Sequence, residues 1–185
     1  KSKLKEFYES NKILIFSAVL IFLILLGSIT YYIKNKKNKK ILLSENYLKA
    51  QIYLDSEKKN EATDILKKTI LENDRTYSTL SFFLILKHDL IKNNEEITFL
   101  FNHLLKQIKY DQDEKNLLIY KKIIFSSNFA KEADLLEEAK PLLKKDSLWR
   151  PHVLMLLGDY FISKKENLKA KEFYTKILSI ANLSK

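Results

Sequence analysis

The feature that most limits the possible folds is an uninterrupted apolar run near the beginning of the chain. It extends over 21 uncharged residues from Ile13 to Ile33, of which 14 are Ile, Leu, Val or Phe. As a helix with a rise of about 1.5 Å per residue, the run is roughly 31 Å long, which matches the hydrocarbon thickness of a bilayer. Its apolar side chains contribute roughly −4 to −8 kcal/mol towards insertion, whereas a helix of a soluble domain needs only one apolar stripe. The run therefore predicts a single membrane-spanning helix.

The residues that follow the run indicate an anchor that stays attached to the chain. Tyr31 and Tyr32 lie near its end, and a lysine-rich stretch comes next. Tyrosine at the interface followed by lysine is typical of the end of a membrane anchor. The alternative, a cleaved signal peptide, has a shorter apolar region and small residues at its cleavage site. The predicted organisation is a short N-terminal segment (1–12), a transmembrane helix (13–33), a basic juxtamembrane segment (34–40) and a helical repeat domain (41–185).

The charges beside the anchor leave its orientation open. Four lysines precede the apolar run and five follow it within seven residues. By the positive-inside rule this small difference favours a cytoplasmic carboxyl-terminal side only mildly.

The basic residues are concentrated at one end of the chain and do not predict nucleic-acid binding. Of the net charge of +10, residues 1–40 carry +7 and residues 41–185 carry +3. Lysine accounts for 31 of the 33 basic residues, whereas phosphate recognition favours the planar guanidinium of arginine. Neither an RNA-binding aromatic motif nor a zinc-finger spacing is present. We therefore expect no nucleic-acid partner.

The remainder of the chain is expected to be helical. Only two Gly and two Pro occur in 185 residues, too few for the tight turns of a β-rich fold. From Ile41 onwards, apolar residues recur at helical spacing between short breaks rich in Asn, Asp, Ser and Lys. The predicted fold class is therefore all-α. The expected helical spans are 41–56, 59–72, 76–92, 94–109, 113–128, 130–143, 147–163 and 167–183.

A repeat of 35 to 37 residues runs through these helices. It separates Ala62, Ile97, Ala133 and Ala170, which belong to the second helix of successive pairs. The clearest unit, 151–184, resembles the tetratricopeptide pattern of Leu-Gly, an aromatic residue, Ala and a second aromatic residue. The positions that carry this pattern are Leu157, Gly158, Phe161, Ala170 and Tyr174.

Small residues are expected where two helices of a pair cross closely. Gly158 precedes Ala170 by twelve residues, and Ala50 precedes Ala62 by the same interval. We predict a tetratricopeptide-like α-solenoid of about four helix pairs; the alternative is an eight-helix domain with coincidental spacing. The middle units depart from the pattern, so either their packing differs or the alignment shifts there. The residues at the place of Gly158 in these units are Ile85 and Lys121.

The first helices of stacked pairs form a concave face that usually binds proteins or peptides. At one repeat position, all four units have an apolar residue, and these four residues could line the concave face. Their alternative role is packing between the repeats. The candidate protein-binding residues are Tyr47, Phe82, Leu118 and Met155.

The sequence offers no recognisable catalytic chemistry. Cysteine is absent, the three histidines are scattered, and no glycine-rich phosphate loop, nucleophile elbow or HExxH motif occurs. His88 and Asp89 are adjacent on a helix and point about 100° apart, so they form no dyad. Asp111, Asp113 and Glu114 could suggest a calcium site, but the twelve-residue loop with its central Gly is missing. They are expected to form a solvated loop that caps a helix. We expect no enzyme activity, no cofactor and no metal.

As a whole, the chain resembles the YfgM-type family of bacterial inner-membrane proteins, which are accessory to the Sec translocon. The resemblance covers nearly the full length. Its local carriers are the stretches 45–50 (ENYLKA), 77–80 (YSTL), 92–95 (KNNE) and 149–174, with Leu157-Gly158-Asp159 and Lys169-Ala170 in the last of them.

The resemblance implies a membrane-anchored scaffold with its carboxyl-terminal domain in the periplasm. It also implies partnership with the SecYEG channel and the membrane-anchored chaperone PpiD, and a chaperone-like role towards unfolded secretory proteins. An alternative of another class is a structural protein of membrane-complex assembly or cell division, unrelated to secretion.

Overall fold

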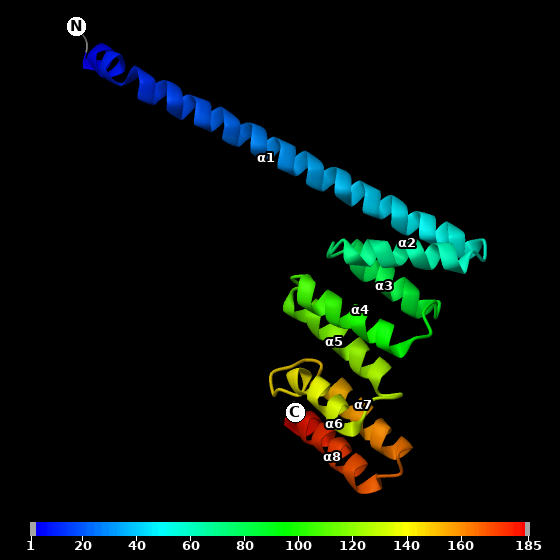
Figure 1. Cartoon of the computed structure of the whole chain (residues 1–185). Helices are drawn as coiled ribbons and strands as arrows, with labels where there is room; N and C mark the ends of the chain where they lie inside the picture. The colour runs from blue at the N-terminus through cyan, green and yellow to red at the C-terminus, as the bar shows by residue number, and fades with distance from the viewer. Residues whose placement is uncertain (1–2, 184–185) are drawn as a thin grey trace.

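One long helix followed by a stack of shorter helices makes up the protein (Figure 1). The computed structural model describes residues 3–183, and over that range it contains no β-strand. The prediction of an all-α chain with an apolar N-terminal helix and solenoid-like packing is confirmed. The elements are α1 (Lys3–Asp55), α2 (Lys59–Leu71), α3 (Tyr77–Lys87), α4 (Asn94–Gln107), α5 (Gln112–Ser126), α6 (Glu132–Ala139), the short 3-10 helix η1 (Lys140–Leu142), α7 (Arg150–Ser163) and α8 (Asn167–Leu183).

Helix α1 joins the apolar run, the lysine-rich segment and the first helix of the repeat domain. Non-helical dihedral angles occur inside it at Asn11, before the apolar run begins. No Gly or Pro lies between Gly27 and Pro141, and lysine is a good helix former, so nothing stops the helix at the end of the apolar run. The predicted boundaries at 33/34 and 40/41 therefore mark changes in chemistry within one continuous helix.

The described side chains of the apolar run of α1 are exposed; Phe22 and Leu23, for example, are 60% and 58% exposed. In Figure 1, this part of α1 extends away from the other helices. Within the described residues, this is the one helix that is long and apolar enough to cross a membrane.

Four helices are followed by a residue other than glycine whose backbone adopts the left-handed conformation. Glu57, Asn73, Asp89 and Lys165 have φ between 51° and 62° and follow α1, α2, α3 and α7. After α7, the backbone N–H of Glu166 donates to the carbonyl of Phe161 at 2.9 Å, and equivalent bonds follow α1 and α3. These are Schellman-type ends, so the turn inside three of the four helix pairs has the same construction.

Two hydrophobic clusters form the core. The first extends from Ala50 on α1 to Leu118 on α5, and the second from Ile123 on α5 to Ala170 on α8. Helix α5 contributes to both clusters and so joins the two halves of the stack, as Figure 1 also shows.

Small residues lie where the helices of the first and last pairs cross. Ala50 and Ala62 between α1 and α2 are fully buried, as is Ala170 between α7 and α8. These two pairs pack more extensively than α3 and α4, whose equivalent residues, Ile85 and Ile97, are large and buried. Side-chain size at this position therefore accounts for the different packing of the second pair.

The predicted alignment of the third pair is wrong by two residues. Lys121 and Ala133 were aligned with Gly158 and Ala170, but both are exposed. The fully buried residues of this pair are Ile123 and Leu135, which are also twelve residues apart. The buried residues of the third pair thus keep the twelve-residue spacing, but both lie two residues later in the sequence than the repeat pattern predicts.

Replacing Gly158 with Val is expected to lower the free energy of unfolding of the repeat domain by about 1–3 kcal/mol, because it overpacks the crossing of α7 and α8. A Cβ atom at Gly158 would lie 2.5 Å from Cε1 of Tyr174. The hydroxyl of Tyr174 donates to Oδ1 of Asp159 at 2.7 Å, which holds the ring in place. Chemical unfolding of the detergent-solubilised chain, followed by circular dichroism, measures the effect.

The other glycine of the chain supplies a matched control. A Cβ atom at Gly27 would have no neighbour within 4 Å, so Gly27→Val should leave unfolding of the repeat domain unchanged. Equal midpoints for Gly158→Val and the unmodified chain would contradict the close crossing.

Candidate protein-interaction surfaces

The four candidate binding residues have different surroundings in the structure. Phe82 and Leu118 are buried in the first core cluster, so the alternative of packing between repeats holds for both. Tyr47 is half-buried against the same cluster, with its ring centroid 6.4 Å from that of Tyr77. Met155 on α7 is 55% exposed. The structure therefore does not bring the four together on one open face.

An open groove lies between the carboxyl-terminal ends of α1 and α3. Leu48 and Ile52 form its apolar rim and are 56% and 62% exposed. The buried side chain of Leu84 contributes to its floor. The groove has a volume of about 500 Å³, and its remaining lining residues are Gln51, Leu54, Asp55, Lys87 and His88.

The sequence contained a signal for this α1–α3 groove that the repeat pattern did not use. On a helix with about 100° between residues, Leu48 and Ile52 lie opposite the small residue Ala50. Ala50 is buried at the crossing with α2, so the first helix is apolar on two opposite sides. One side packs in the core, and the other is exposed at the rim of the groove.

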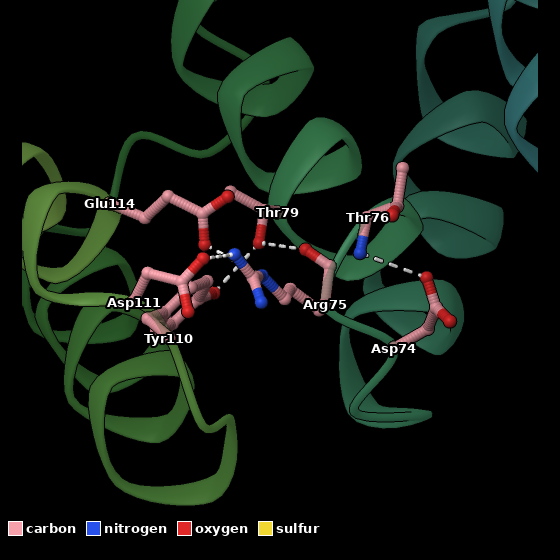
Figure 2. Close-up of polar contacts among 7 residues, drawn as sticks. All are labelled: Asp74, Arg75, Thr76, Thr79, Tyr110, Asp111 and Glu114. Atoms are coloured by element: carbon pink, nitrogen blue, oxygen red, sulfur yellow. Dashed lines mark hydrogen bonds and ion pairs between the residues drawn. The ribbon is translucent and has the colours of Figure 1, made fainter.

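The polar contacts in Figure 2 tie consecutive helix pairs together at the turns. Nε of Arg75, between α2 and α3, donates to Oε2 of Glu114 at 2.7 Å, and the same guanidinium pairs with Asp111 at the start of α5. Asp111 makes no side-chain capping bond, so the expectation that it caps a helix is wrong. These carboxylates raise the pKa of Arg75, chiefly through the hydrogen bond that its guanidinium donates to Glu114.

A second contact beside the ion pairs joins α3 to the α4–α5 turn. The hydroxyl of Thr79 donates to the carbonyl oxygen of Arg75 at 2.7 Å. It lies 2.7 Å from the hydroxyl of Tyr110, which is therefore placed to donate to Thr79. Burial raises the pKa of Tyr110, and the bond with Thr79 opposes that change. The cluster therefore links the α2–α3 turn and the start of α3 to the α4–α5 turn.

The α2–α3 turn itself is held by local bonds. Oδ1 of Asp74 accepts hydrogen bonds from the backbone N–H groups of Thr76 and Tyr77, at 3.0 and 2.8 Å. A ring nitrogen of His103 on α4 lies 2.8 Å from Oδ1 of Asn73. The polar side chains around the α2–α3 turn thus bond to groups of the protein itself. No group of three or more His, Cys, Asp or Glu side chains that could hold a metal ion occurs in the described part of the chain.

These features define an all-α protein in which one apolar helix extends from a solenoid-like stack of helices that carries the α1–α3 groove. Its sequence is 31% identical over 156 residues to the ancillary SecYEG translocon subunit of Buchnera aphidicola subsp. Schizaphis graminum (strain Sg), covering 82% of this chain and 77% of that protein. The chain belongs to the family of ancillary SecYEG translocon subunits, and the predicted YfgM-type resemblance is confirmed. No family model matches the chain, and no solved structure matches it.

Proposed function

We propose that this protein is a membrane-anchored, non-enzymatic ancillary subunit of a SecYEG translocon, and that its repeat domain binds other proteins. The observation that carries the proposal is the relationship to the ancillary subunit of Buchnera aphidicola. The exposed apolar run of α1 supports the anchor, since water would otherwise surround its side chains. Anchoring confines the domain to the membrane surface and raises its effective concentration beside a channel.

The finer parts of the proposal follow from the resemblance to the YfgM-type family. The protein lies in the bacterial inner membrane with its carboxyl-terminal domain in the periplasm. There it cooperates with a membrane-anchored chaperone such as PpiD and acts in a chaperone-like way on unfolded secretory proteins. Exposed apolar side chains on first helices, such as Met155 and the rim of the α1–α3 groove, suit the weak apolar contacts of that role.

The α1–α3 groove is the contact surface that we assign to a partner protein. Leu48 is 15 residues beyond Ile33 on the same helix, which places it about 22 Å along the helix axis from the end of the apolar run. A protein that extends beyond the membrane surface beside the anchor can reach this height. Helix α1 thus supplies both the anchor and one wall of the groove.

The double substitution Leu48→Asp and Ile52→Asp is expected to reduce recovery of translocon components with the tagged protein by about tenfold or more, because two apolar contacts are lost. Co-purification from native membranes in mild detergent measures it. The matched control is Leu168→Asp, an 83% exposed leucine in the first turn of α8, which should leave recovery unchanged.

The experiment tests the proposed function and the assignment of the groove separately. If the unmodified protein recovers no translocon component, the proposed function is wrong. If the double variant recovers as much as the unmodified protein, the partner binds elsewhere and the α1–α3 groove is excluded.

The lysines at 34–40 favour a second candidate, a cytoplasmic protein of membrane-complex assembly, because positive residues are retained on the cytoplasmic side. Protease treatment of spheroplasts distinguishes the two. Digestion of the repeat domain supports the periplasmic scaffold, and protection of the domain supports the cytoplasmic candidate.

A further inference from the structure

Five lysines form a ring around α1 immediately beyond the apolar run. We call this set, Lys34, Lys36, Lys37, Lys39 and Lys40, the lysine collar. All five are exposed, and the backbone that carries them is continuous with the candidate membrane span. Their height above the end of the span is therefore fixed by the helix. At about 1.5 Å per residue they lie roughly 1.5 to 10 Å beyond Ile33, within and just above the headgroup layer of a bilayer.

The collar faces the headgroups mainly on one side of the helix. Successive residues are about 100° apart, and Lys39 lies on the side that faces the end of α2. The other four lysines fall within about 160° of the circumference. All four are exposed at the height of the lipid headgroups.

Most of the collar has no acidic partner within the described chain. Lys39 is the exception: its Nζ lies 2.8 Å from Oε2 of Glu72 and 3.2 Å from the carbonyl oxygen of the same residue, at the end of α2. In residues 3–183, the structure pairs no carboxylate with the other four lysines. Four unpaired positive charges thus remain beside the headgroups, together with the tyrosine pair at the interface.

We propose that the lysine collar binds the headgroups of anionic phospholipids in the leaflet beside the repeat domain. The inference rests on the proposed membrane anchor, since the height of the collar is counted from the span. Each lysine near an anionic surface increases association by about fivefold. The bond between Lys39 and Glu72 places the end of α2 at the same level, so the bound lipids lie directly beside the first helix pair.

The test uses the full chain reconstituted into vesicles that contain trace spin-labelled phosphatidylglycerol or spin-labelled phosphatidylcholine. The ratio of the two association constants at the protein surface is the readout. We expect a ratio of about five or more in 0.1 M salt and a marked fall in 1 M salt, where the Debye length shortens to about 3 Å. The fourfold variant Lys34→Gln, Lys36→Gln, Lys37→Gln and Lys40→Gln should lower the ratio by about fivefold or more. The remaining preference is that of Lys39 and of the lysines that precede the span.

Two controls separate position from net charge. Four exposed lysines away from the span, replaced by Gln, remove the same charge and should leave the ratio unchanged: Lys106, Lys109, Lys144 and Lys145. Replacing the four collar lysines with Arg should preserve the ratio, because the charge stays in place.

Each other outcome overturns the proposal. Failure of the chain to resist carbonate extraction from the vesicles overturns the anchor and the collar together. A stable insertion with equal ratios for the unmodified chain and the collar Gln variant overturns the collar alone. An unchanged ratio combined with loss of translocon recovery in that variant would assign the collar to a protein partner instead.

Discussion

Replacing Phe82 with Ala is expected to lower the free energy of unfolding of the repeat domain by about 3–5 kcal/mol. The side chain is fully buried on α3. Its ring meets that of Phe101 on α4 edge to face, with centroids 4.5 Å apart, so truncation leaves a cavity between the two helices that pack least well. Chemical unfolding of the detergent-solubilised chain, followed by the helical circular dichroism signal, measures the loss.

Met155→Ala is the comparison that makes this result informative. Both residues hold the same repeat position, but Met155 is 55% exposed, and substitutions of exposed residues usually change stability by about 0.5 kcal/mol or less. If Phe82→Ala were as stable as Met155→Ala, Phe82 would not be a core residue. Its earlier interpretation as a contact for a partner would then be restored.

The double substitution Leu23→Arg and Ile24→Arg is expected to remove the protein from the membrane fraction. These residues lie at the middle of the apolar run. An arginine at the centre of a span costs about 2.5–3.5 kcal/mol, whereas the leucine or isoleucine that it replaces contributes about −0.3 to −0.6 kcal/mol. The two changes together cost about 6–8 kcal/mol, comparable to the whole insertion energy of the run. Carbonate extraction followed by immunoblotting measures the fraction that stays in the membrane.

Leu23→Ile together with Ile24→Leu keeps the apolar composition and should leave the protein in the membrane pellet. A soluble, shortened form of the unmodified chain would contradict the anchor and would show that the run is a cleaved signal peptide. The Arg variant must also be recovered from the pellet at a lower level than the control for the anchor to stand.

Local chemistry in the sequence was sufficient to predict the helices. Apolar runs, polar breaks and the scarcity of Gly and Pro predicted the all-α chain and helices close to those observed, because each signal acts over a few residues. The small residues Ala50, Ala62, Gly158 and Ala170 also predicted the two closest helix pairs. A side chain larger than that of Gly or Ala is unfavourable where two helix backbones cross closely. Small residues therefore indicate where the distance between two helices is short.

The third pair and the binding residues could not be derived in the same way. An alanine is tolerated on any face of a helix, so Ala133 matched the repeat spacing while lying exposed in the first turn of α6. Phe82 and Leu118 share a repeat position with Met155, yet the first two are buried and Met155 is 55% exposed. Burial at this position depends on which other elements pack over it, and the pattern of a single helix does not contain that information.

The polar contacts at the turns are long-range as well. Arg75 lies 36 residues from Asp111 and 39 from Glu114. Asp111 directly precedes α5 and Glu114 lies in its first turn, a spacing of three residues that places them on one side. Nothing in the sequence selects Arg75 as their partner among 33 basic residues.

The uninterrupted course of α1 makes the bilayer part of the domain's geometry. From Ile33 to Asp55 the helix continues for 22 residues, a lever arm of about 33 Å without a hinge. A span tilts when the hydrocarbon layer becomes thinner, and a tilt of about 10° would swing the far end of this arm by about 6 Å. If α1 spans the membrane as proposed, a change in bilayer thickness therefore changes the angle of the helix pairs to the membrane plane.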